Sequence, residues 1–143
     1  MSKKGLKTPL RYPGGKSRAC SKMESYFPDL KKYTEFREPF LGGGSVALFV
    51  SKKYPHLKIT VNDLYEPLAN FWSNLQMFGD DLTKDLKNLK ITHCNQDSAR
   101  CLFAEMKDII SNNKFTDLER AVAFYVVNKC SFSGLTESSS FSA

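Results

Sequence analysis

The chain has 143 residues, which is enough for a compact domain with a core of its own. Its hydrophobic fraction of 41% and charged fraction of 25% are ordinary for a globular protein. No apolar run is long enough to cross a bilayer, and the basic N-terminus lacks the apolar core of a signal peptide. These features exclude a membrane-spanning protein, and we expect a cytoplasmic one.

The net charge of +6 is concentrated near the N-terminus and favours a polyanionic partner, although a solvated basic tail explains it equally well. The cations concerned are Lys3, Lys4, Lys7, Arg11, Lys16, Arg18 and Lys22. The cysteines at 20, 94, 101 and 130 lack the paired spacing of a zinc site or a disulfide framework, so we expect reduced thiols. A metal site that uses His56, His93, Cys94 and Cys101 is disfavoured by its irregular spacing.

The first predicted elements lie between residues 17 and 62. A short amphipathic helix is predicted over residues 17–27, because apolar residues recur there at four-residue spacing. An extended segment includes Phe36 and precedes a glycine turn. Ser45 is a candidate N-cap for a helix through Tyr54, and residues 58–62 alternate in the pattern of a second strand. This strand–helix–strand order predicts the start of a parallel α/β sheet.

Helices dominate the predicted second half. Pro67 fits the first turn of a helix that ends near Gly79, a candidate C-terminal cap. Further helices are predicted near residues 82–89, 98–110 and 118–129, and residues 131–143 have no clear ending signal. Only two strands are evident. Because a two-stranded parallel sheet leaves both edges open, we interpret the chain as truncated.

Two glycine motifs and one acidic residue carry the chemistry. They are Arg-Tyr-Pro-Gly-Gly-Lys at 11–16, Glu-Pro-Phe-Leu-Gly-Gly-Gly-Ser at 38–45, and Val-Asn-Asp at 61–63. Glycines at a strand-to-helix turn let backbone amides approach a ligand at the helix N-terminus. A carboxylate about 20 residues further on, at the end of the next strand, can accept hydrogen bonds from ribose hydroxyls. The order predicts a pocket for a cofactor that contains adenosine.

These motifs, together with Val-Asn-Lys-Cys-Ser-Phe-Ser-Gly-Leu at 127–135, resemble the Dam-type adenine-specific DNA methyltransferases. The resemblance extends from about residue 9 to the end of the chain. It implies a partial Rossmann-like α/β fold of the class I methyltransferases, with few parallel strands, flanking helices and a truncated sheet. It also implies S-adenosylmethionine as the methyl donor and double-stranded DNA as the substrate, in a bacterial or phage-infected cell. A restriction–modification system and a phage origin both stay open.

The resemblance also implies which residues hold the donor. Lys16 would face the donor's carboxylate, and the ring of Tyr12 would pack against the donor. Phe40, Gly42 and Gly44 would shape the turn under its methionine end. Asp63 would hold the ribose hydroxyls, or cap the helix at residue 66, or both.

One family motif is missing. Asp-Pro-Pro-Tyr, which in the family holds the flipped adenine, occurs nowhere in the 143 residues. We therefore expect residues 1–112 to be the donor-binding part, residues 113–143 to begin the target-recognition region, and the chain alone to be inactive. The alternative is a non-catalytic half that binds donor or DNA and works with a partner chain or a missing C-terminal portion that carries the motif.

A phosphate-binding P-loop is a weaker alternative. Gly15-Lys16-Ser17 matches the end of that motif, but Leu10 stands where its first glycine belongs, and no strand is predicted before it.

Overall fold

The computed structural model describes residues 7–134, 136 and 138–142. The chain divides into two compact units, unit 1 over residues 1–64 and unit 2 over residues 65–143. Unit 1 contains α1 (Cys20–Glu24), the 3-10 helix η1 (Leu30–Lys32), β1 (Glu35–Glu38), α2 (Ser45–Lys53) and β2 (Lys58–Val61). Unit 2 contains α3 (Glu66–Met77), α4 (Gly79–Thr92), α5 (Gln96–Ile109), α6 (Asp117–Cys130) and the 3-10 helix η2 (Phe132–Gly134).

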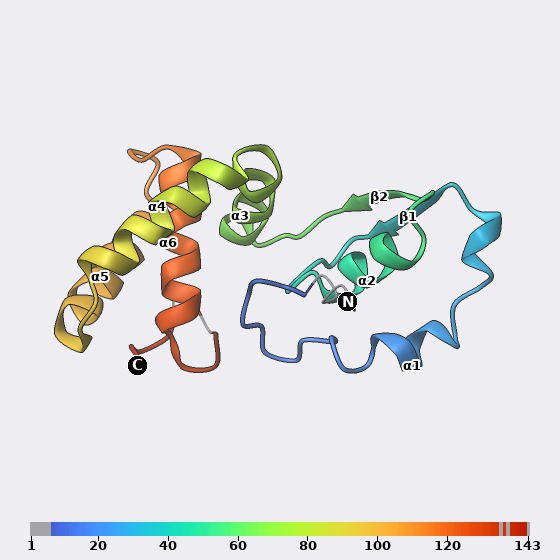
Figure 1. Cartoon of the computed structure of the whole chain (residues 1–143), viewed down its shortest axis with the longest axis horizontal. Helices are drawn as coiled ribbons and strands as arrows, with labels where there is room; N and C mark the ends of the chain where they lie inside the picture. The colour runs from blue at the N-terminus through green and yellow to red at the C-terminus, as the bar shows by residue number, and fades with distance from the viewer. Residues whose placement is uncertain (1–6, 135, 137, 143) are drawn as a thin grey trace. The chain divides into compact units, whose positions relative to one another are not determined.

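Unit 1 is built on a parallel pair of strands joined by a helix (Figure 1). β1 and β2 pair in register from Glu35 opposite Lys58 to Glu38 opposite Val61, with α2 in the connection. The predicted strand–helix–strand order and the mixed α/β class are confirmed. The sheet has two strands within the described part of the chain, as expected from the sequence.

The start of α2 differs from the prediction. Gly44, in the left-handed conformation with φ of +68°, is the N-cap, and Ser45 is the first helical residue. The Ser45 hydroxyl instead shares a 2.8 Å hydrogen bond with the hydroxyl of Ser17. The prediction of Ser45 as a capping side chain is therefore wrong. A positive φ at the N-cap position is a conformation that glycine adopts without the steric cost of a Cβ.

The core of unit 1 lies between α1, α2 and the strands. Its buried members are Cys20, Leu30, Val46, Val50 and Leu57, and partly buried aromatic and aliphatic residues pack around them. Each fully buried aliphatic side chain contributes roughly 1.5–3 kcal/mol. This small core fixes α2 against the strands and so holds the loops at their carboxyl ends.

α1 is shorter than the helix predicted over residues 17–27. Tyr26 and Phe27 donate backbone hydrogen bonds three residues back, to Met23 and Glu24, so the helix ends in tight turns. Pro28 explains the early end, because a proline disfavours the helical conformation of the residue before it.

Unit 2 is a helical cluster around α6. The buried face of α6 includes Ala121, Val122, Ala123, Phe124, Val126 and Val127. From α3, the buried ring of Phe71 stacks on Tyr125 with centroids 5.8 Å apart and contacts Phe124 at 5.6 Å. The predicted helices near residues 67–78, 82–89, 98–110 and 118–129 are all present, with small shifts of their ends.

Gly79 does not act as the predicted left-handed cap. Phe78 occupies the C-cap of α3, and Gly79 is the first residue of α4, which follows without a loop. Gly79 is also absent from the glycines with positive φ. Pro67, by contrast, sits in the first turn of α3 as predicted.

The described part of the C-terminal segment folds back on unit 2. Ser131 and Phe141 form an antiparallel bridge, and the Ser142 N–H donates to the Cys130 carbonyl at 2.8 Å. Phe141 packs edge-on against Phe103 at 5.7 Å. The segment of residues 131–143, which lacks a clear ending signal in the sequence, also includes residues 135, 137 and 143, which lie outside the described residues.

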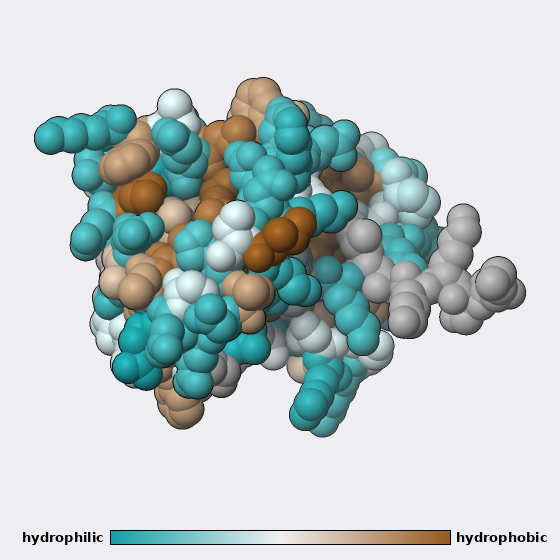
Figure 2. Space-filling model, turned by 60° about the vertical axis from the view of Figure 1, so that its left-hand side comes forward, coloured by the Kyte–Doolittle hydropathy of each residue, from teal (hydrophilic) through white to brown (hydrophobic). Residues whose placement is uncertain are grey.

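The surface is largely hydrophilic on the face that Figure 2 shows, with apolar side chains in separate spots. Such scattered apolar residues are normal for a globular protein. Among the described helices, none combines the length and apolar character that a bilayer crossing requires.

Candidate functional site

A cavity of about 280 Å³ opens in unit 1 where both strands end. Glu38 is the last residue of β1, and Asp63 follows the end of β2 by two residues. In open α/β sheets, ligands bind outside the carboxyl ends of the strands. The lining residues are Tyr12, Gly14, Gly15, Lys16, Glu38, Phe40, Leu41, Gly42, Gly43, Ser45, Val46 and Asp63.

The second glycine motif forms a tight turn between β1 and α2. Gly42 and Gly44 have φ of +50° and +68°, a region that favours glycine. The Gly44 N–H donates to the Leu41 carbonyl at 2.9 Å and closes the turn. The turn therefore presents backbone rather than side chains to the cavity.

Asp63 ties this turn to the second strand. Its Oδ2 accepts a hydrogen bond of 2.8 Å from the Gly42 N–H. The predicted alternative, that Asp63 caps the next helix, is not what the structure shows, because the N-cap of α3 is Tyr65 and no side chain caps it. Asp63 thus holds its carboxylate against the glycine turn and at the edge of the cavity.

Tyr12 lies directly on the glycine turn. A Cβ built on Gly42 would stand 2.9 Å from Cε1 of Tyr12, and one on Gly43 would stand 2.8 Å from its Cβ. Both distances are shorter than real Cβ contacts, so the ring can lie there only because these residues are glycines. The first motif contributes its own bend, in which the Gly15 N–H donates to the Tyr12 carbonyl at 3.0 Å.

Cys20 and the Ser17–Ser45 pair fasten the first loop to α2. The buried Cys20 thiol donates to the Lys16 carbonyl at 3.2 Å and to the Ser45 carbonyl at 3.6 Å. Burial raises the pKa of this thiol, and the nearby Glu38 raises it further, so it stays protonated and keeps donating. These contacts hold the two glycine bends on either side of one cavity.

Glu38 is a cavity residue that the sequence did not single out as a ligand contact. Its Oε2 is buried and has no hydrogen-bond partner among the described residues. Burial raises the pKa of Glu38, while a hydrogen bond from the Ala47 N–H and the charge of Lys16 lower it. Its position as the last strand residue before the glycine turn is the sequence feature that could have identified Glu38 as a cavity residue.

The structure brings together five of the six residues predicted to bind a cofactor. Tyr12, Lys16, Phe40, Gly42 and Asp63 line the cavity, whereas Gly44 shapes the turn without lining it. Phe40 is 83% exposed at the rim and Tyr12 is 44% exposed. Three segments separated in the sequence thus converge on one space. Their roles toward a ligand stay a prediction.

The P-loop alternative finds no support in this geometry. Residues 7–12 form no strand, and the helix after Lys16 is the five-residue α1.

The described residues hold no group of three or more His, Cys, Asp or Glu that could bind a metal ion.

The chain matches the family model of the D12 class N6 adenine-specific DNA methyltransferases over residues 12–142. It is 26% identical over 140 residues to the Type II methyltransferase M.MjaIII of Methanocaldococcus jannaschii, an alignment that covers 91% of this chain and 47% of that protein. It is 28% identical over 127 residues to the DNA N-6-adenine-methyltransferase of Escherichia phage P1, covering 89% of this chain and 15% of that protein.

The chain spans about half the length of the first of these relatives and less of the second. The match to the family model, in contrast, includes both glycine motifs, Asp63 and nearly all of unit 2. The two-stranded parallel sheet and six α-helices of the described residues are compatible with part of a methyltransferase fold. On this match the chain is a member of the D12 class of N6 adenine-specific DNA methyltransferases.

Proposed function

We propose that the whole protein transfers a methyl group from S-adenosylmethionine to the N6 amine of adenine in double-stranded DNA, and that unit 1 binds the donor. The observation that carries this proposal is the shared cavity of Tyr12, Lys16 and Asp63, which come from three segments of a chain in an adenine-methyltransferase family. The donor supplies an electrophilic methyl group; the residues of this chain bind and orient it.

The polar groups around the cavity match the two ends of such a donor. Asp63, which accepts from the Gly42 N–H beside the cavity, would accept hydrogen bonds from ribose hydroxyls. At the amino-acid end, the Lys16 ammonium would pair with the donor's carboxylate. The buried Glu38 Oε2, to which no described residue donates a hydrogen bond, would provide the acidic partner for the donor's ammonium.

The apolar and backbone groups complete the proposed site. Gly42 and Gly44 carry no side chains, so the donor would be able to lie close to the backbone of this turn near the start of α2. Tyr12 and Phe40 offer aromatic surface at the cavity for the flat part of the donor.

We further propose that the fold is a partial Rossmann-like one and that the acceptor half of the active site is not in this chain. The 143 residues contain no Asp-Pro-Pro-Tyr motif, which would hold the flipped adenine. The functional division is proposed at residue 112, with donor binding before it and the start of target recognition after it. This division differs from the boundary of the two structural units, which lies at residue 64.

A second candidate is a non-catalytic half that works with a partner chain. The absence of an Asp-Pro-Pro-Tyr motif from the 143 residues is what supports it. Both candidates predict donor binding and no methyl transfer by this chain alone. They differ when a polypeptide carrying the Asp-Pro-Pro-Tyr motif is added: a split enzyme gains transfer of labelled methyl groups to DNA.

Donor binding by Asp63 variants tests the proposal. Asp63→Ala should weaken binding of S-adenosylmethionine more than tenfold by calorimetry, because a hydrogen bond to a charged group contributes roughly 1.5–3 kcal/mol. Asp63→Asn can still accept from the Gly42 N–H, so we expect it to fold normally and bind with an intermediate affinity.

Asp80→Asn serves as the matched control, since Asp80 is an exposed carboxylate in the first turn of α4. It should bind the donor as the unmodified chain does. Equal affinity of the Asp63→Ala and unmodified chains would remove Asp63 from the site, and no donor binding by the unmodified chain would reject the proposed function.

A further inference from the structure

The charge of the chain is divided unequally between its units. Unit 1 carries thirteen Lys and Arg and five Asp and Glu, a net charge of +8, whereas unit 2 carries eight and ten, a net charge of −2. The region proposed to begin target recognition lies in unit 2. Electrostatic attraction for a polyanion therefore comes from the donor-binding unit.

Within unit 1 the excess of positive charge is concentrated in the residues that precede the first carboxylate. Residues 7–22 contain five cations, and the first acidic residue of the whole chain is Glu24. Glu24 is itself paired with Lys53 and accepts from the Tyr54 hydroxyl. The segment thus has no carboxylate of its own to neutralise it.

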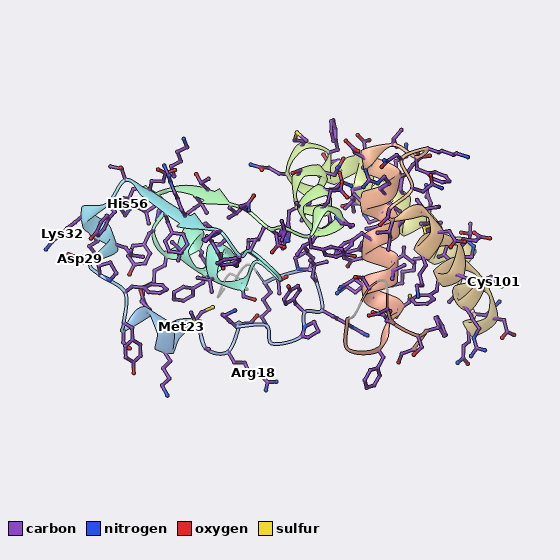
Figure 3. The ribbon with its side chains drawn as sticks, turned by 180° about the vertical axis from the view of Figure 1, so that it is seen from behind. Arg18, Met23, Asp29, Lys32, His56 and Cys101 are labelled. Carbon is purple, nitrogen blue, oxygen red and sulfur yellow. The ribbon has the colours of Figure 1, made fainter. Side chains whose placement is uncertain are left out.

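Arg18 and Lys22 are two cations of this segment that do not line the cavity. Both are exposed, and neither forms an ion pair within the described residues. Other cations of unit 1 are partnered, such as Arg37 with Glu35 at 2.9 Å. Figure 3 shows the Arg18 side chain pointing away from the ribbon, from the loop just before α1.

The same segment forms one wall of the donor cavity. Tyr12 and residues 14–16 line it, and Arg18 follows Lys16 by two residues. The Cys20 thiol, bonded to the Lys16 carbonyl, and the Ser17–Ser45 hydrogen bond fix the loop that carries Arg18 next to this wall.

We propose that the segment of residues 7–22, chiefly through Arg18 and Lys22, binds the phosphate backbone of double-stranded DNA beside the donor site. The inference rests on the proposed function, which requires DNA close to the donor. Phosphate contacts position a duplex without reading its sequence. This segment, rather than unit 2, supplies the salt-dependent part of DNA binding by this chain.

The test is a salt titration of duplex DNA binding by the full 143-residue chain, followed by fluorescence anisotropy. The slope of log K against log[salt] is negative, and each lost phosphate contact reduces its magnitude by about 0.9. Arg18→Gln with Lys22→Gln should therefore reduce that magnitude by roughly 2. The charge-retaining pair Arg18→Lys with Lys22→Arg should keep the slope. The matched control in unit 2, Lys84→Gln with Lys87→Gln, removes two exposed cations of α4 and should also leave the slope unchanged.

Calorimetry on the same variants measures donor binding, so the DNA-binding proposal can fail without the proposed donor site failing. Donor affinity should stay unchanged in Arg18→Gln with Lys22→Gln. An unchanged slope in that variant, a reduced slope in the α4 control, or no salt-dependent DNA binding by the unmodified chain would overturn the proposal. Tighter binding of duplex RNA than of duplex DNA would overturn the choice of partner. None of these outcomes would remove the donor site.

Discussion

At the scale of single residues, the glycines of the second motif make room for a side chain of the protein as well as for a ligand. Gly43 does not have a positive φ, yet a Cβ there would stand 2.8 Å from Cβ of Tyr12. Spacing in the sequence marks the glycine motif as a turn, but contact with a tyrosine 31 positions earlier appears only in the structure.

Gly43→Ala should therefore act through Tyr12. We expect the added methyl to displace the ring and weaken donor binding by about 1–2 kcal/mol, the typical cost of overpacking, or roughly tenfold. The loss should be much smaller when Tyr12 is already replaced by Gly, which a double-mutant cycle measures by calorimetry. Gly79→Ala is the control, because nothing lies within 4 Å of its Cβ position. Additive losses would contradict the contact.

Glu38 makes the stability of unit 1 depend on pH. Burial raises the pKa of this carboxyl, so the folded chain holds the proton more tightly than the unfolded chain does. The stabilising effect of that proton is complete below the ordinary glutamate pKa, about 4.3, and is lost as pH rises through the raised pKa.

Glu38→Gln should remove this dependence. The difference in unfolding free energy between the unmodified chain and the variant should shift in favour of the variant as pH rises from 4 toward neutrality, as urea unfolding at several pH values would show. Glu24 and Glu35 have lowered pKa values from their hydrogen-bonded cations and act in the opposite direction, so the difference between the two proteins is the quantity to follow. A constant difference would contradict a destabilised Glu38 carboxylate.

At the scale of elements, the two predicted strands and the helices of unit 2 follow from local patterns. Apolar spacing in α3 to α6 reflects which side chains are buried. In β2 the alternation marks a strand in which Ile59 is partly buried and Val61 is exposed. The ends of these elements were harder to predict. Ser45 is a favourable capping residue, yet Gly44 takes the N-cap, with φ of +68° in the turn that its N–H closes on the Leu41 carbonyl.

Two hydroxyl deletions test this difference in capping. Thr116 caps α6 in a complete capping box with Glu119, so Thr116→Ala should cost about 1 kcal/mol of stability in unit 2. Ser45→Ala removes only an exposed hydroxyl contact with Ser17 and should cost clearly less in unit 1. Denaturant unfolding of each variant against the unmodified chain measures both. A larger cost at Ser45 would indicate that it caps α2 after all.

At the scale of the whole molecule, unit 1 holds the candidate donor site and most of the positive charge, and unit 2 is a helical cluster around α6. The convergence of two glycine motifs and Asp63 could be predicted, because the carboxyl ends of parallel strands lie at one edge of a sheet. Three other features could not be predicted, because they depend on how side chains from distant segments are placed. They are the Asp63–Gly42 hydrogen bond, the buried Glu38 oxygen without a partner among the described residues, and the Cys20 contacts.

The most direct test of the central claim is a titration of the chain with S-adenosylmethionine, followed by the backbone amide signals of its glycines in NMR spectra. Gly14, Gly15, Gly42 and Gly43 line the cavity, whereas Gly79 and Gly134 lie in unit 2. We predict that the four cavity signals shift together with one dissociation constant while the two in unit 2 stay in place. Shifts confined to unit 2, or different dissociation constants for the two glycine motifs, would contradict a single donor site built from both.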